Sequence, residues 1–208
     1  MTIRAVITAL DGVLVDIAGL DDEIFQYVIR RVIGKNISLT EQRRDLGNLS
    51  FNSKISLLNM RGIIKWADLE IIQALYHERI FHIFNERIKP NNDIISVGEF
   101  IRHSGKCFVC VTNKDYQVAL FALDCCGVLP YIQYIVTPDQ VPMGKPAGYG
   151  YTRALEYCQS QPENTLVLES DQLGVEAASR AGCRAYHVSR KQNLNVSFIS
   201  SLMDIQNG

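Results

Sequence analysis

The chain has 208 residues, 47% of them hydrophobic and 21% charged, and a formal net charge of -1. This composition is ordinary for a globular protein with one sizeable core, and the near-zero charge excludes a global field that would recruit nucleic acid or an anionic membrane surface. No apolar run reaches the ~18 residues of a membrane-spanning helix, and the N-terminal residues lack a signal-peptide pattern. We therefore expect a soluble, cytoplasmic protein without nucleic-acid or membrane partners, and the sequence leaves its oligomeric state open.

Short apolar runs alternate with amphipathic segments of helical length along most of the chain. The runs, bounded by turn-forming residues, predict strands at 3–10, 106–111, 131–137, 164–169 and 184–188. The segments between the later strands predict helices near 114–126, 147–159 and 172–181. This alternation predicts an α/β fold with a Rossmann-like, doubly wound parallel sheet that carries helices on both faces.

The region between residues 17 and 88 breaks the alternation because it contains no convincing strand. Residues 21–33 predict one helix, which Gly34 ends. A second helix opens at Phe51 with Asn52 or Ser53 as its N-cap, and a third covers 66–88. We therefore expect an all-helical domain of residues 17–88, inserted after the first strand into a core domain of residues 1–16 and 89–208.

Polar residues follow the first two core strands, at the edge where ligands bind in open parallel sheets. The first strand runs into Asp11-Gly12, a common turn pair. The second ends in Thr112-Asn113 before a helix, which offers a hydroxyl, an amide and free backbone N–H groups. These groups suit a phosphate oxygen, although a plain helix N-cap would explain them as well.

Two further patterns follow later in the chain. Lys145 stands between Gly144 and Pro146 in a tight loop, where its ammonium group is suited to neutralise a phosphate. The fourth core strand runs into Glu169-Ser170-Asp171-Gln172-Leu173-Gly174-Val175-Glu176-Ala177-Ala178.

Together and in this order, the four patterns resemble the four signatures of the haloacid dehalogenase superfamily. The last is similar to the beta-phosphoglucomutase and phosphatase-like branch, which has Glu-Asp-Ser-x-x-Gly-Val-x-Ala-Ala at this point. The resemblance covers roughly residues 3–190 and implies a helical cap at 17–88. It also implies a phosphate-monoester phosphatase or phosphosugar mutase that uses Mg²⁺ and acts on a small phosphorylated metabolite.

The chain departs from the family at both metal-binding carboxylates. In the family's first signature, Asp-x-Asp-Gly, the first Asp attacks phosphorus and binds magnesium, and here that position holds Ala9. The second Asp matches Asp11, which implies a general acid/base whose backbone carbonyl also binds the metal. Ser170 stands at the position of the second metal-binding Asp, and Asp171 stands where the family has Ser.

The remaining matches imply a phosphate site with a weakened metal site. By the resemblance, Thr112 and Asn113 bind phosphate, and Lys145 both binds phosphate and assists the reaction. Glu169 and Asp171 remain near the metal position as further candidate ligands. Because Mg²⁺ prefers charged oxygen ligands, we expect its binding here to be weak.

Three explanations of these departures are open: a naturally impaired homologue, an active enzyme with ligands rearranged through Asp171, and an engineered nucleophile replacement. Changes at both metal carboxylates favour the first. We therefore expect a hydrolase scaffold with impaired catalysis. The alternative is a non-catalytic pseudoenzyme that binds a phosphometabolite or a protein.

The six cysteines include one pair with metal-ligand spacing, Cys107-x-x-Cys110. This pair lies within a predicted strand, where residues three apart point to opposite faces, so their sulfur atoms should not converge on a metal. We expect reduced thiols, since disulfides are rare in cytosolic proteins.

Overall fold

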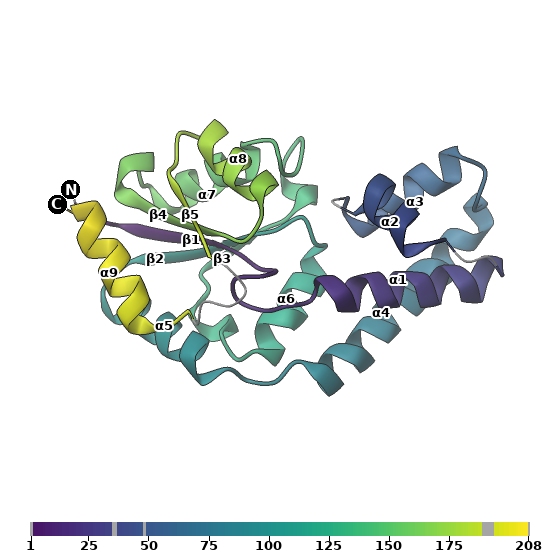
Figure 1. The fold of residues 1–208 in the computed structure, drawn as a ribbon, viewed down its shortest axis with the longest axis horizontal. Helices are drawn as coiled ribbons and strands as arrows, with labels where there is room; N and C mark the ends of the chain where they lie inside the picture. Colours follow the sequence, from purple (N-terminus) through teal and green to yellow (C-terminus); the bar gives the residue numbers. More distant parts are fainter. Residues whose placement is uncertain (1, 35–36, 48, 189–193, 208) are drawn as a thin grey trace.

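The computed structural model describes residues 2–34, 37–47, 49–188 and 194–207 (Figure 1). Its centre is a five-stranded parallel sheet with the strand order β3-β2-β1-β4-β5. The strands are β1 (Ala5–Ala9), β2 (Cys107–Val111), β3 (Tyr134–Val136), β4 (Thr165–Glu169) and β5 (Ala185–His187). The predicted parallel α/β sheet is confirmed, and the strands lie within the predicted runs.

Helices cover both faces of this sheet, as the sequence predicts. Figure 1 shows α7 (Tyr149–Cys158) and α8 (Gln172–Arg180) above the sheet, with α5 (Asn92–His103), α6 (Tyr116–Cys125) and α9 (Val196–Asn207) below it. Side chains alternate between the two faces along each strand. On β1, for example, Val6 joins one core cluster and Ile7 joins the other. The sheet is therefore buried on both sides.

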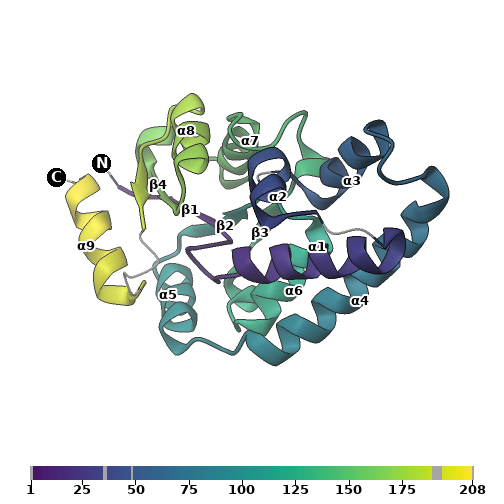
Figure 2. The same ribbon diagram turned by 45° about the vertical axis from the view of Figure 1, so that its right-hand side comes forward.

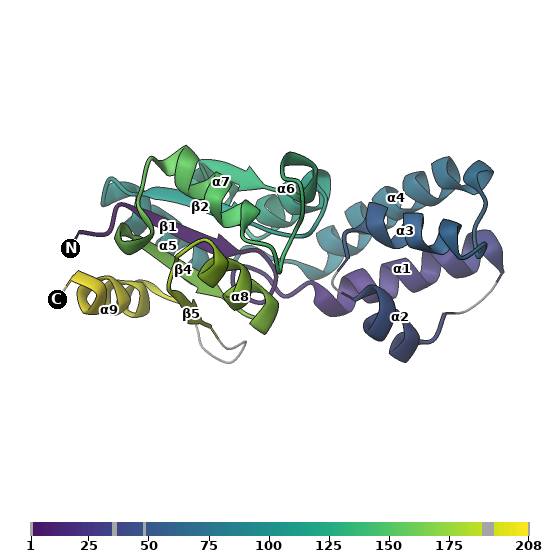
Figure 3. The ribbon, with the colours of Figure 1, turned by 90° about the horizontal axis from the view of Figure 1, so that it is seen from above.

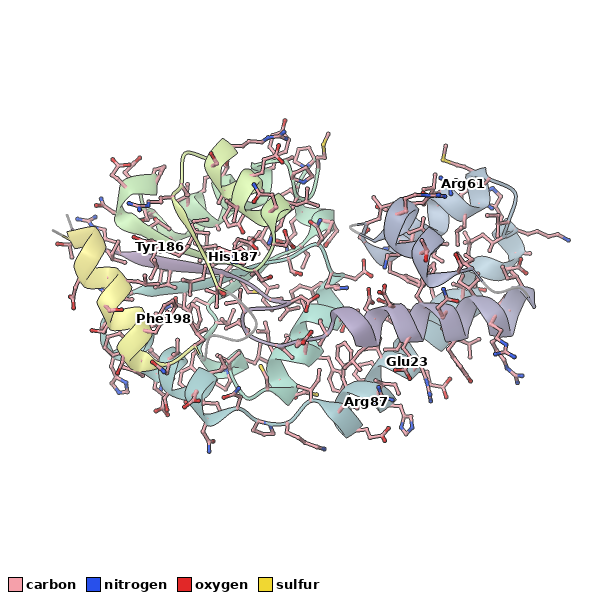
Figure 4. All side chains as sticks on the ribbon, viewed as in Figure 1. Glu23, Arg61, Arg87, Tyr186, His187 and Phe198 are labelled. Atoms are coloured by element: carbon pink, nitrogen blue, oxygen red, sulfur yellow. The ribbon has the colours of Figure 1, made fainter. Side chains whose placement is uncertain are left out.

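Four helices lie beside the sheet, beyond the carboxyl ends of its strands (Figures 1 and 2). They are α1 (Ala18–Ile33), α2 (Leu39–Leu46), α3 (Phe51–Met60) and α4 (Leu69–Arg87). The view from above shows α1 next to α4 (Figure 3). Near the sheet-side end of this pair, Arg87 donates to Glu23 at 2.8 and 3.3 Å (Figure 4). The division of the chain into two domains at these helices stays a prediction.

Several details differ from the predicted elements. The N-cap of α3 is Ser50, so the prediction of Asn52 or Ser53 is wrong. Ser50 has extended backbone angles, and its Oγ accepts from the Ser53 backbone N–H at 3.2 Å. Asn52 and Ser53 already lie inside the helix, where the capping geometry is lost. The predicted stop at Gly34 is confirmed, because this glycine has a left-handed φ of 68°.

The predicted helix at 66–88 consists of a short 3-10 turn followed by α4. Helices α2, α5 and α9 have no counterpart among the predicted elements. The 3-10 turns within the described residues are η1 (Trp66–Asp68), η2 (Leu129–Tyr131), η3 (Pro138–Gln140) and η4 (Pro162–Asn164). None of the helices in the described ranges combines the length and the apolar content needed to cross a membrane.

Candidate functional site

The strand-end patterns meet in one pocket at the carboxyl edge of the sheet. The pocket encloses about 560 Å³ of space, part of it open to solvent. Its lining consists of Ala9, Leu10, Asp11, Gly47, Leu49, Thr112, Asn113, Lys114, Lys145, Asp171 and Leu173. Most of these residues come from the sheet side, whereas Gly47 and Leu49 lie between α2 and α3. Parallel strands explain this convergence, since their carboxyl ends share one edge.

The turn after β1 fixes the carboxylate of Asp11. Gly12 has a φ of 76°, which a residue with a side chain rarely adopts, and its N–H donates to the Val15 carbonyl at 2.8 Å. The Ile17 backbone N–H, just before α1, donates to Asp11 Oδ1 at 3.0 Å. The acidic group is therefore held in place by the backbone at the start of the helical segment.

Ala9 and Ser170 both adjoin this turn and lack carboxylates. Ala9 ends β1 and is only 4% exposed, and its methyl group has no nucleophilic or metal-binding atom. Ser170 follows β4, and its Oγ donates to the backbone carbonyl of Asp11 at 2.7 Å. The family resemblance implied that the Asp11 carbonyl binds magnesium, but here this carbonyl accepts a hydrogen bond from a hydroxyl group.

The segment after β2 positions the loop that carries Lys145. Asn113 Oδ1 accepts from the Lys145 backbone N–H at 2.9 Å, and Asn113 Nδ2 donates to the Lys145 carbonyl at 3.1 Å. An added Cβ at Gly144 would lie 2.6 Å from Asn113 Oδ1, which explains the glycine. The side-chain amide of Asn113 is therefore engaged with the protein, whereas we expected it to face phosphate.

Thr112 leaves a hydroxyl hydrogen for the pocket. Its Oγ1 accepts from the Lys114 backbone N–H at 3.1 Å, and the side chain is buried except where it lines the pocket. A hydroxyl that accepts one hydrogen bond still carries its own donor. Thr112 thus has the geometry expected of a group that donates to an anion.

Glu169 contacts the ammonium group of Lys145. This carboxylate is 0% exposed, and its Oε1 contacts both Lys145 Nζ and the Tyr151 hydroxyl. The Ser170 backbone N–H donates to its other oxygen at 3.1 Å. Burial, followed by the negative charge of Glu169, raises the pKa of Tyr151 well above its usual range, so Tyr151 stays a donor. Both oxygens of Glu169 are thus occupied by protein donors.

A comparison with known protein families decides the identity of this scaffold. The model of the haloacid dehalogenase-like hydrolases matches residues 3–182. The chain belongs to this family. A phosphorylated carbohydrates phosphatase of Thermotoga maritima is 30% identical over 191 residues, which cover 91% of this chain and 87% of the relative.

Solved structures show the same fold at lower identity. A beta-phosphoglucomutase from Clostridium difficile is 16% identical with a TM-score of 0.77, covering 98% of both chains. CbbY from Rhodobacter sphaeroides in complex with phosphate is 20% identical with a TM-score of 0.77, covering 88% of this chain and 85% of that one. The family expected from the four signatures is confirmed, and so is its Rossmann-like fold.

The site offers fewer charged oxygen donors than a magnesium ion prefers. Within the described ranges, no three His, Cys, Asp or Glu side chains are grouped so as to hold a metal. Asp171 is the N-cap of α8, and its Oδ1 accepts from the Gly174 backbone N–H at 2.7 Å. With Ala9 apolar and Glu169 bound to Lys145, the described lining keeps only the Asp11 and Asp171 carboxylates as candidate charged ligands for Mg²⁺.

A second charged cluster borders the pocket, and the sequence did not reveal it. Lys114 lines the pocket, and its Nζ contacts Asp21 Oδ2 on α1 at 2.6 Å. Lys54 on α3 approaches the same oxygen at 3.3 Å, and the Tyr76 hydroxyl on α4 donates to Asp21 Oδ1 at 2.7 Å. We call these four residues the Asp21 cluster. The other three members lie 33 to 93 residues after Asp21 in the sequence, so no local spacing of residues could indicate this cluster.

Electrostatics in this cluster favour the charged forms. Burial opposes ionisation of Asp21, but the ammonium groups of Lys114 and Lys54 outweigh it and lower the pKa of Asp21 far below its usual range. Burial likewise opposes the charge of Lys114, yet Asp21 raises the pKa of Lys114 above its ordinary value. The cluster therefore holds the loop after β2 against α1, α3 and α4 through ionised groups.

Proposed function

We propose that this chain binds a small phosphorylated metabolite at the pocket and turns it over slowly or not at all. The single observation behind the proposal is the pair of changes around Asp11. Ala9 provides no nucleophile, and the Ser170 hydroxyl donates to the Asp11 carbonyl at 2.7 Å. In the family, as our resemblance has it, these positions supply the attacking oxygen and the metal carboxylates.

The loss of both groups affects the chemistry more than the binding. Covalent catalysis needs a nucleophilic oxygen or its equivalent, which a methyl group cannot replace. Asp11 still carries a carboxylate that the Ile17 N–H orients, so it remains suited to hold or release a proton. Mg²⁺, when bound in family members, would clamp and neutralise a phosphate. We propose that its binding here is weak.

Phosphate binding rests on groups that the chain retains. Lys145 presents an ammonium group, and Thr112 presents a hydroxyl donor, both in the pocket lining. Glu169 partly neutralises Lys145, and Asp21 partly neutralises Lys114, so the pocket is less positive than two free lysines would make it. We propose that residues 17–88 form the cap of this pocket, because Gly47 and Leu49 line it from that segment.

The test of impaired catalysis is hydrolysis of an aryl phosphate with Mg²⁺ by four proteins. These are the unmodified chain, Ala9→Asp, the double variant Ala9→Asp/Ser170→Asp, and Ala9→Asn as the matched control that adds bulk without a nucleophile. We expect turnover in the double variant and far less, or none, in the others. Turnover by the unmodified chain as fast as by the double variant would refute the proposal.

The test of binding is the melting temperature with and without inorganic phosphate, since a ligand that binds only the native state raises it. Thr112→Val should reduce the shift, because it removes a donor while keeping the shape. Thr152→Val on the exposed surface of α7 is the control and should leave the shift unchanged. If neither phosphate nor a phosphosugar raises the melting temperature of the unmodified chain, the proposed binding role is wrong.

A second candidate is an active enzyme whose ligands are rearranged through Asp171. The supporting observation is that Asp171 lines the pocket together with Asp11. This candidate requires turnover by the unmodified chain that Asp171→Asn abolishes. Because Asp171 also caps α8, Asp171→Ser is a useful second variant, since asparagine and serine both retain capping ability while removing the charge.

A further inference from the structure

Two cysteines meet at the end of the molecule opposite the pocket. Cys107 is the first residue of β2, and Cys158 is the last residue of α7. Their Sγ atoms are 2.7 Å apart, within about 0.7 Å of the ~2.05 Å length of a disulfide bond. Both side chains are half-buried and pack against the same core cluster. Only a small movement therefore separates the two thiols from a covalent bond.

We propose that Cys107 and Cys158 form a redox-active dithiol that closes to an intramolecular disulfide when a small-molecule disulfide such as oxidised glutathione reaches it. The Cys107 thiolate attacks one glutathione sulfur, which forms a mixed disulfide and releases one reduced glutathione. The Cys158 thiolate then attacks the Cys107 sulfur, and the second reduced glutathione leaves. The two protein thiols lose two electrons and two protons, and oxidised glutathione is reduced.

The surroundings of the six cysteines favour this pair. Cys125 is half-buried, and its thiol approaches Asn85 Oδ1 at 3.9 Å. Cys110, Cys126 and Cys183 are buried, so an oxidant in solution cannot reach them. Burial raises the pKa of Cys110 to about 12 and that of Cys183 to about 11, which keeps them protonated and unreactive. The Cys158 thiol donates to Cys107, which lowers the pKa of Cys107 and makes it the attacking group.

The predicted separation of Cys107 from Cys110 agrees with this assignment. Cys110 belongs to the core cluster on one face of the sheet, whereas Cys107 packs against the cluster on the other face. The expectation that these two do not converge is confirmed. The partner of Cys107 comes instead from α7, 51 residues further along the chain, which no strand periodicity could indicate. Such a bond would cross-link β2 to α7 without touching the pocket.

The test is oxidation of the folded protein with oxidised glutathione, followed by intact mass measurement and tryptic mapping without reduction. We expect a mass lower by two hydrogen atoms and one cross-linked peptide pair, 107–114 joined to 154–180. The second peptide contains Cys158 as its only cysteine, and fragmentation of the first distinguishes Cys107 from Cys110. Oxidation should also raise the melting temperature, and a reductant should reverse this rise.

Two variants make the outcome decisive. Cys158→Ser should stop the reaction at a glutathione adduct on Cys107 and abolish the rise in melting temperature. Cys125→Ser, a change at another half-buried cysteine, should leave the cross-link unchanged. The proposal is overturned if the unmodified chain keeps the glutathione adduct, if the mapped bond joins other cysteines, or if no thiol is oxidised under native conditions.

Discussion

Replacing Asp21 by asparagine should destabilise the protein strongly, because Asp21 is the shared partner of two lysines. The side chain of Lys54 is 3% exposed and that of Lys114 is 20% exposed, so neither ammonium group regains much water. Removing one partner of a buried ion pair typically costs about 3–5 kcal/mol. With a urea m-value of about 2.5 kcal/mol/M, the unfolding midpoint should fall by about 1–2 M.

The control for this prediction lies on the same helix. Glu23 pairs with Arg87, but both side chains are about half exposed, at 48% and 46%. Exposed pairs of this kind contribute about 0–1 kcal/mol, so Glu23→Gln should leave the urea midpoint nearly unchanged. The double variant Asp21→Asn/Lys54→Met should be more stable than Asp21→Asn alone, because it also removes a buried charge.

The pH dependence of the same variant gives an independent check. The pKa of Asp21 is lowered on folding, so its stabilisation is complete well above the unfolded value of about 3.9 and is lost as the pH falls below it. The difference between the chain and Asp21→Asn should shrink by about 1.4 kcal/mol per pH unit below that point. Burial, which both proteins share, is the main cause of the raised pKa of Asp115, but the charge of Asp21 adds to it, so only the burial contribution cancels. The reasoning would be refuted if Asp21→Asn lowered the free energy of unfolding no more than Glu23→Gln does, or if its effect did not change with pH.

Three further predictions concern the pocket. Asn113→Ala removes two hydrogen bonds to the Lys145 backbone and should lower the free energy of unfolding, measured in urea, by about 1–3 kcal/mol. Phosphate should then raise the melting temperature by less than it does in the unmodified chain. Gly174→Ala places a Cβ 2.1 Å from Glu169 Cδ and should lower the free energy of unfolding by at least ~1–3 kcal/mol. An unchanged free energy of unfolding would contradict the close contact between Gly174 and Glu169. Calorimetry should detect weak or no Mg²⁺ binding to the chain and tighter binding to Ala9→Asp/Ser170→Asp.

The sequence predicts the positions of the pocket residues better than their partners. Asp11, Thr112 and Lys145 lie far apart in the chain. Their convergence follows from the parallel strands, because each residue lies in a segment that follows the carboxyl end of a strand. Their contacts depend on side-chain packing, which periodicity does not encode. The amide of Asn113 therefore holds Lys145, although its position alone suggested a phosphate ligand.

The elements that the sequence missed have physical reasons of their own. Helix α2 is short and polar, so it carries little of the apolar spacing on which the prediction depends. The Asp21 cluster joins α1, α3 and α4 to the loop after β2, and such long-range pairing leaves no local pattern. The cap of α3 was misplaced by two or three residues because several serines and asparagines near 50–53 are equally suitable on sequence grounds.

The hydrogen bond from Ser170 to the Asp11 carbonyl also links the effects of substitutions at residues 9 and 170. An aspartate introduced at residue 9 alone would add a negative charge beside Asp11, opposite a hydroxyl that is already directed at the backbone. An aspartate at residue 170 alone would replace that donor with an acceptor facing a carbonyl oxygen. Each single substitution is therefore electrostatically unfavourable unless a cation lies between the facing oxygens. Under the proposed function, the two positions form a coupled pair, and turnover requires both changes together.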